Sequence, residues 1–229
     1  MSIEERLAAF GLGEDDLAAW RATGKGEDDL EVWLVDRVAR RPVGARARAV
    51  YGAEVYGAED IHDFARRRIL AALDLGPGER LLEIGCGGGL LLRDALATGA
   101  TATGLDHSEE MVGLARERAP GATVVLGTAN ELPFADQAFT AAAISIVLMF
   151  LDEPVPALRE CRRVLGPHAR LALYTTSPAL RGTPAIPELM ASHTHLYVDD
   201  ALAALARDAG FADVRVEDED GGQLLTASR

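Results

Sequence analysis

The stretch LLEIGCGGGLLL, residues 81–92, decides the fold of this chain. LLEI is typical of a buried strand, and four glycines crowd into the next five positions. Glycine costs backbone entropy in any ordered element, so these glycines indicate a turn at which the backbone passes close to another group. A strand, a glycine turn and a helix in this order are typical of the first unit of an open α/β sheet, in which ligands bind beyond the carboxyl ends of the strands.

From Arg80 onward, segments typical of strands alternate with segments typical of helices. The predicted strands, in chain order, are LLEIG, TATGLDH, TVVLGTA, FTAAAISIV, ARLALYTT, DVRVEDED and GQLLTASR. The helices between them are predicted at about 88–98, from Ser108 as N-cap to Pro120, at about 153–165 and at about 199–209. Such alternation predicts an α/β fold with a mostly parallel seven-stranded sheet, and the last two strands predict a closing antiparallel hairpin.

The segment before this pattern reads as helical. Ser2 and Glu5 fit a capping box at the start of its first helix. We therefore predict a helical N-terminal cap or lid over 1–75 and an α/β domain over 76–229. An irregular stretch at about 177–197, which carries three prolines, is interpreted as a substrate insert. The four helices of the cap are predicted at about 3–10, 14–22, 27–40 and 59–73.

Composition narrows the possible partners. The formal charge of -13 opposes binding to nucleic acid, because cationic contacts to phosphate supply most of that affinity. No apolar run approaches the ~18 residues of a membrane helix, and the N-terminus lacks the pattern of a secretion signal. The two cysteines, Cys86 and Cys161, form neither a disulfide framework nor a metal-ligand spacing. These features predict a cytoplasmic protein without a metal, as a monomer or a homodimer.

Eight arginines gather between residues 37 and 68. They are interpreted as a solvated helix surface paired with nearby acids, with a grip on an acidic small substrate as the alternative.

Two kinds of ligand compete for the glycine turn. A dinucleotide fingerprint, G-x-G-x-x-G, would need glycine where Leu90 stands. Glu83, two positions before the first glycine, would repel a pyrophosphate but suits an ammonium group. No lysine followed by serine or threonine completes a phosphate-binding P-loop.

The pattern Glu83-x-Gly85-x-Gly87-x-Gly89 resembles motif I of the class I S-adenosylmethionine-dependent methyltransferases. The resemblance extends over about 80–175. GTANELPFADQAF is similar to a stretch of the family that usually reads GDAexLPFxdxxFD, and LRECRRVLGPHARLALYT resembles the family's helix and fifth strand. The resemblance implies a Rossmann-like methyltransferase fold with S-adenosylmethionine as cofactor and S-adenosylhomocysteine as product.

The resemblance also implies roles for individual residues. The glycine loop would hold the amino-acid end of the cofactor, aided by Glu83 through a water, because the glycines make room for it. Asp106, at the end of the second strand, would accept hydrogen bonds from the ribose hydroxyls, and Met111 would pack against adenine. The full set expected to bind the cofactor is Tyr51, Glu83, Gly85, Cys86, Gly87, Gly89, Asp106, His107, Met111, Thr128, Ala129, Asn130 and Ser145.

Two positions depart from the family pattern. Thr128 replaces the aspartate that takes the adenine amino group, and Thr140 replaces the aspartate of the FD pair, often a structural position. Tyr51 and Tyr56 resemble a tyrosine-containing segment of the family's N-terminal lids, with core packing of the cap as the alternative. Cys86 is interpreted as a small buried residue rather than as a nucleophile.

The acceptor site is less clearly marked. Ser145 leads into IVLMFL, and Met149 and Phe150 there indicate either an apolar acceptor site or the start of a buried helix. His193 and His195, in the insert, are the candidate catalytic bases, since histidine titrates near neutral pH. Their alternative is a surface role. His62 beside Asp63 is interpreted as an exposed pair, with a substrate-side base as the alternative.

We predict a methyltransferase acting on a small-molecule acceptor, such as a natural product or other metabolite. A second hypothesis is an enzyme that uses S-adenosylmethionine without methyl transfer, as a cyclase or decarboxylase would. A third is a non-catalytic cofactor-binding protein, which the replacement at Thr128 favours. A nicotinamide oxidoreductase comes last because of Leu90.

Overall fold

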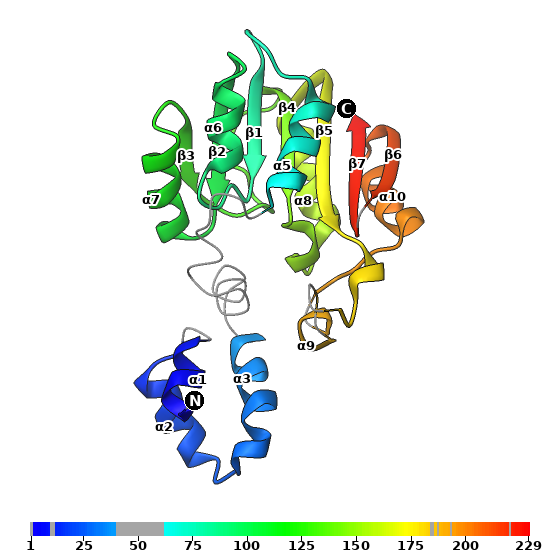
Figure 1. The fold of residues 1–229 in the computed structure, drawn as a ribbon. Helices are drawn as coiled ribbons and strands as arrows, with labels where there is room; N and C mark the ends of the chain where they lie inside the picture. Colours follow the sequence, from blue (N-terminus) through cyan, green and yellow to red (C-terminus); the bar gives the residue numbers. More distant parts are fainter. Residues whose placement is uncertain are drawn as a thin grey trace.

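A seven-stranded sheet of order β3-β2-β1-β4-β5-β7-β6 organises the α/β part of the computed structural model (Figure 1). β1 to β5 run parallel, and β7 pairs antiparallel with both β5 and β6. This confirms the predicted parallel sheet with its C-terminal hairpin. The strands are β1 (Arg80–Ile84), β2 (Thr101–Asp106), β3 (Thr123–Leu126), β4 (Phe139–Ser145), β5 (Leu165–Thr176), β6 (Ala212–Glu219) and β7 (Gly222–Ser228).

The structure describes residues 2–9, 12–39, 62–183, 186, 188–192, 194–219 and 221–229. The helices within these ranges are α1 (Ile3–Ala9), α2 (Glu14–Ala22), α3 (Leu30–Ala39), α5 (Asp63–Leu73), α6 (Leu90–Leu96), α7 (Glu109–Arg118), α8 (Pro154–Val164), α9 (Glu188–Ala191) and α10 (Asp199–Asp208), with short 3-10 turns η1 (Glu27–Asp29), η2 (Leu148–Phe150) and η3 (Pro178–Leu180).

Helices cover both faces of the sheet, and β1 shows how the sequence sets this up. Leu82 and Ile84 belong to one core, with residues of α8 and α10 such as Cys161 and Leu202. Leu81 belongs to the opposite core, with residues of α5, α6 and α7. Alternate side chains of a strand point to opposite faces, so a strand covered on both faces has to be apolar almost throughout.

Both cysteines are buried, Cys161 in the first of these cores and Cys86 in the second. Burial raises the pKa of both thiols. This confirms the expected burial of Cys86.

The order of the strands reverses at β1. The chain moves from β1 to β2 on one side and returns to β4 on the other side. The carboxyl ends of β1 and β4 therefore form a switch point, where open α/β sheets bind their ligands. The glycine turn follows β1 at this edge.

α1, α2 and α3 form a small core of their own, made of Leu7, Leu12, Trp20, Leu30 and Leu34. The predicted capping box is confirmed, because the Ser2 Oγ accepts the N–H of Glu5 at 3.1 Å and the Glu5 carboxylate accepts the N–H of Ser2 at 2.6 Å. Tyr51 and Tyr56 lie outside the described residues. Closure of a cap over the site stays a prediction.

α5 is anchored on the sheet by both apolar and charged contacts. Ile69 and Leu73 are fully buried. Arg66 is 8% exposed, and its guanidinium lies 2.6 Å from the Asp63 carboxylate and 2.7 Å from Asp94 of α6. For Arg66 the expected pairing with nearby acids is confirmed, but the expected solvation is wrong, because this side chain is buried between α5 and α6.

Thr140 of β4 contacts residues at the start of β1. The hydroxyl of Thr140 contacts the Glu79 carboxylate and accepts the N–H of Arg80 at 2.9 Å, so this departure from the family pattern has a structural role.

Within the described ranges, no helix has both the length and the apolar character needed to cross a bilayer.

Candidate functional site

Two adjacent pockets open at the carboxyl edge of the sheet. The larger has a volume of about 260 Å³ and the smaller about 90 Å³. The larger is lined by His62, Ile84, Gly85, Leu105, Asp106, His107, Met111, Gly127, Thr128, Ala129, Asn130, Ser145, Ile146, Val147, Phe150 and Leu151. The smaller is lined by His62, Arg66, Glu83, Gly85, Cys86, Gly87, Gly88, Leu90, Leu91, Arg118 and Ser145.

The glycine turn is shaped largely by the protein's own packing. A Cβ on Gly85 would lie 2.3 Å from Val147 Cγ2, and one on Gly89 would lie 2.8 Å from the Cα of Ala115 in α7. Only at Gly87, of the loop's four glycines, would a Cβ meet open space. The expectation that all these glycines make room for a ligand therefore needs correction, since at Gly85 and Gly89 neighbouring segments of the chain already occupy the space.

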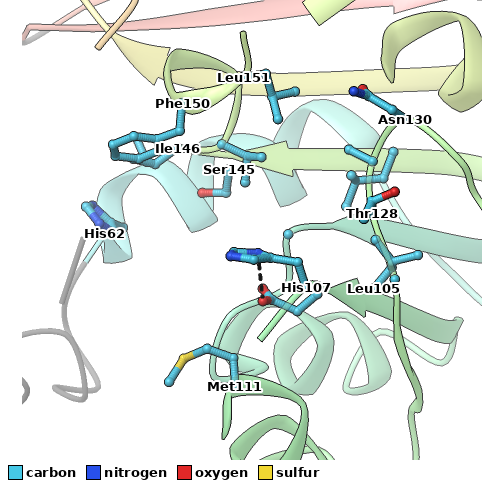
Figure 2. A pocket seen from close by; sticks show the side chains of 16 residues that line it. His62, Leu105, His107, Met111, Thr128, Asn130, Ser145, Ile146, Phe150 and Leu151 are labelled. Carbon is cyan, nitrogen blue, oxygen red and sulfur yellow. Dashed lines mark ion pairs between the residues drawn. The ribbon is translucent and has the colours of Figure 1, made fainter. Parts of the chain in front are cut away.

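Asp106 connects the end of β2 to the glycine turn. Its carboxylate is 6% exposed and accepts the N–H of Gly87 at 2.8 Å and the N–H of Ser108 at 3.0 Å. The hydroxyl of Ser108 in turn accepts the N–H of Met111, which confirms Ser108 as the N-cap of α7. His107 Nδ1 lies 3.5 Å from Asp106 Oδ1 (Figure 2). One buried carboxylate thus fixes the loop and faces the larger pocket.

Glu83 brings a buried acid to the smaller pocket. It is 3% exposed, and its Oε2 has no hydrogen-bond partner among the described atoms. Burial, and next the charge of Asp106, raise the pKa of the Glu83 carboxyl well above its ordinary value of 4.5. Arg66 and Arg118 line the same pocket. A buried carboxyl with one unpaired oxygen, in a pocket that two guanidinium groups also line, offers complementary groups to a zwitterion.

The raised pKa of Glu83 gives the Glu83→Gln variant an expected dependence on pH. A carboxyl whose pKa rises on folding makes the folded state less stable as pH increases from the unfolded pKa of about 4.5 towards the folded one. Glutamine is neutral throughout, so the stability of the variant relative to wild type should increase between about pH 5 and about pH 8. Urea unfolding at both pH values measures this.

Glu160→Gln is the matched control for this experiment. The pKa of the Glu160 carboxyl is lowered, first by its hydrogen bond from Arg163. The charged Glu160 carboxylate stabilises the fold at every pH above 4.5, and this contribution is lost only as pH falls through the lowered pKa. Glu160→Gln should therefore be less stable than wild type by the same amount at both pH values. Equal behaviour of the two variants would contradict a raised pKa for the Glu83 carboxyl.

The larger pocket has both polar and apolar lining residues. Figure 2 shows Thr128 and Asn130 at one end of the pocket and Phe150, Ile146 and His62 at the other. Val147 and Leu151 also line the pocket. Ile146 has φ of 54°, a strained value for a β-branched residue of the kind that clusters at functional sites.

Of the two apolar candidates after Ser145, only Phe150 lines the pocket. Met149 is fully buried in a cluster with Ile186 and Ala191. Phe150 thus lines the pocket, whereas Met149 is a core residue of η2, in line with the alternative of a buried helix. An apolar acceptor site here stays a prediction.

The structure does not bring the predicted histidine of the insert to either pocket. His195 lines neither pocket. Its backbone N–H donates to the Met149 carbonyl at 2.8 Å, and its ring Nε2 lies 3.8 Å from the Asp152 carboxylate. Its ring stacks on Tyr197, and half of the side chain is exposed. His193 lies outside the described residues, so the catalytic role of both histidines stays a prediction.

His62, in contrast, was interpreted as exposed, but it is half-buried and lines both pockets. Its neighbour Asp63 pairs with Arg66 and Arg67. Leu105 and Arg118 are absent from the set expected from the sequence, and Arg66 enters it only through the alternative role of the arginine cluster. Leu105 directly precedes Asp106 in β2, whereas Arg118 is brought to the site by α7 and no local pattern marks it.

The fold and the site together define a class of enzyme that binds a nucleoside cofactor at the switch point of an open α/β sheet. The comparisons with known proteins make this specific. A family described as "Methyltransferase domain" matches residues 82–173. A demethylmenaquinone methyltransferase from Renibacterium salmoninarum is 30% identical over an alignment of 181 positions, which covers 69% of this chain and 76% of that protein.

Solved structures agree in fold. The crystal structure of an S-adenosylmethionine-dependent methyltransferase from Aquifex aeolicus has a TM-score of 0.63 at 23% identity and covers 76% of this chain and 95% of its own. A possible histamine N-methyltransferase from Thermotoga maritima has a TM-score of 0.61 at 24% identity, and the match covers 73% of this chain and 90% of that one.

The chain belongs to the S-adenosylmethionine-dependent methyltransferase family, and S-adenosylmethionine is its cofactor.

Proposed function

We propose that this enzyme methylates a small, largely apolar metabolite that enters at the Phe150 end of the larger pocket. The observation that carries the proposal is the apolar wall formed by Ile146, Val147, Phe150 and Leu151 at the switch point of the sheet. Apolar walls with a few convergent polar groups are typical of small-molecule sites. When bound, S-adenosylmethionine supplies an activated methyl group on a sulfonium centre.

The residues of the two pockets fit that cofactor in chemistry. The unpaired Oε2 of Glu83 suits the ammonium of its amino-acid end, and Arg66 and Arg118 suit the carboxylate. Asp106 offers buried acceptor oxygens to the ribose hydroxyls. Met111 lines the same pocket as Asp106 and offers an apolar surface to adenine.

The adenine contacts depend on residues that replace the family's aspartate. Thr128, Ala129 and Asn130 line the polar end of the larger pocket. Their hydroxyl, backbone and amide groups supply donors and acceptors for the ring edge. The set of cofactor residues expected from the sequence therefore surrounds the pockets wherever the structure describes it, except Gly89, which contacts α7 instead.

The class of acceptor is suggested by the relatives. Several are named demethylmenaquinone methyltransferases. An apolar wall with an aromatic side chain suits a flat ring, since aromatic pairs stack favourably. A demethylmenaquinone-type hydroquinone is therefore the first acceptor to test, followed by a panel of phenolic natural products.

Two measurements test the proposal. Calorimetric titration should show micromolar binding of S-adenosylmethionine and S-adenosylhomocysteine and none of NADH. Mass spectrometry should then show an acceptor heavier by one CH₂ group, with S-adenosylhomocysteine formed in equal amount. A rearranged or decarboxylated acceptor with unchanged cofactor would instead establish non-methylating use. Cofactor binding without turnover across the panel would support a non-catalytic protein, and binding of NADH alone would overturn the assignment.

A further inference from the structure

His62 lies where the two pockets meet. Only three of the described residues, His62, Gly85 and Ser145, line both the larger and the smaller pocket. Figure 2 shows His62 on the side of the larger pocket where Phe150 and Ile146 lie. Of the three, His62 is the one that can exchange a proton near neutral pH.

Helix α5 fixes the position of His62 at this junction. It is the N-cap residue of α5, its carbonyl accepts the N–H of Arg66 at 2.9 Å, and α5 is anchored by Arg66 and the buried Ile69. The backbone of His62 is left-handed, with φ of 57° and ψ of 22°. Few residues other than glycine adopt this conformation, and those that do cluster at functional sites.

Burial and a nearby guanidinium favour a neutral ring. The titratable groups that line the same pockets are Arg66 of α5, Glu83 of β1, Cys86 of the glycine turn, Asp106 at the end of β2, His107 after it, and Arg118 of α7. Burial, and next the Arg66 charge, lower the pKa of His62 below its ordinary value of 6.5. A ring that is uncharged near neutral pH has a nitrogen lone pair with which to accept a proton.

We propose that His62 is a catalytic base that removes the proton from the acceptor atom of the methylation. As that atom forms its bond to the methyl carbon, its proton passes to a ring nitrogen of His62, and the electron pair of the broken carbon–sulfur bond stays on sulfur. His62 then releases the proton to solvent. The inference rests on the proposed function and narrows the acceptor to molecules with a weakly acidic O–H, N–H or C–H group.

His62→Asn is the central variant of the test, because asparagine tolerates the left-handed conformation and is a good N-cap. His168→Asn is the matched control: His168 also has a left-handed backbone, with φ of 61°, but is exposed on β5 and lines neither pocket. His195→Asn tests the histidine of the insert in parallel.

The kinetic readout is the dependence of kcat on pH. The wild-type rate should decline as pH falls through an apparent pKa below 6.5. His62→Asn should lower kcat by about 10²- to 10⁴-fold near neutral pH, remove the acid limb and recover part of the rate at high pH, where solvent hydroxide deprotonates the acceptor. An unchanged acid limb in His62→Asn, or its loss in His195→Asn alone, would overturn the proposal.

A second readout needs no acceptor. In nuclear magnetic resonance spectra, the ring signals of His62, assigned by their absence in His62→Asn, should titrate below 6.5 and shift when S-adenosylhomocysteine saturates the site. The His168 signals should keep their positions when S-adenosylhomocysteine is added, because His168 lines neither pocket. Unmoved His62 signals with the ligand bound would overturn the role of His62, whereas failure of wild type to bind the ligand would overturn the proposed function as well.

Discussion

Replacement of Asp106 by alanine is expected to weaken binding of S-adenosylhomocysteine by at least about 100-fold. The buried carboxylate accepts two backbone N–H groups, from Gly87 and Ser108, and hydrogen bonds to a charged group contribute about 1.5–3 kcal/mol each. Alanine removes both the support of the glycine loop and the acceptors that face the pocket. About 1.4 kcal/mol corresponds to a tenfold change in affinity. The loss of the two hydrogen bonds that the ribose hydroxyls are proposed to donate to this carboxylate therefore accounts for the predicted factor, and loss of the two backbone bonds would add to it by loosening the loop.

Calorimetry on a short series of variants measures this effect. Asp106→Asn keeps one carbonyl oxygen as an acceptor and should bind with intermediate affinity. Asp208→Ala, an exposed position at the end of α10 that lines neither pocket, should bind as wild type does. Wild-type affinity in Asp106→Ala would contradict the role assigned to this carboxylate.

Gly89→Ala is expected to destabilise the folded chain by about 2–4 kcal/mol. The φ of Gly89 is +80°, and a left-handed backbone costs a residue with a side chain about 1–2 kcal/mol. The new Cβ would also lie 2.8 Å from the Cα of Ala115. Overpacking of this kind costs about 1–3 kcal/mol, because the helix α7 has to move. Urea unfolding at neutral pH measures the difference.

The same helix supplies a control with the opposite sign. Gly113 lies within α7, and a Cβ added there would meet no atom within 4 Å. Gly113→Ala should stabilise the protein by about 0.5–1 kcal/mol, the ordinary difference between glycine and alanine in a helix. If Gly89→Ala unfolds at the same urea concentration as wild type, α6 and α7 do not pack as described.

Most of the fold could be predicted because its determinants are local. The apolar run of β4, the N-cap at Ser108 and the hairpin glycines act through hydrogen bonds and packing over a few residues. Boundaries were less well predicted: β5 begins at Leu165 rather than near Ala169, and α6 begins at Leu90 rather than 88. The glycine at 89 is the N-cap of α6 with a left-handed backbone, so the helix starts only after it.

The sequence by itself determined the order of the strands and helices, the glycine turn and the acids that face it, Glu83 and Asp106. These follow from periodicity and from a motif contained in one βα unit. Only the tertiary structure decided that Val147 and Ala115 exclude side chains from the turn, that Arg66 is buried and that His62 and Ser145 line both pockets. The physical reason is that β1, β4, α5 and α7 converge at one edge of the sheet, and residues brought together by that packing carry no shared signal in the sequence.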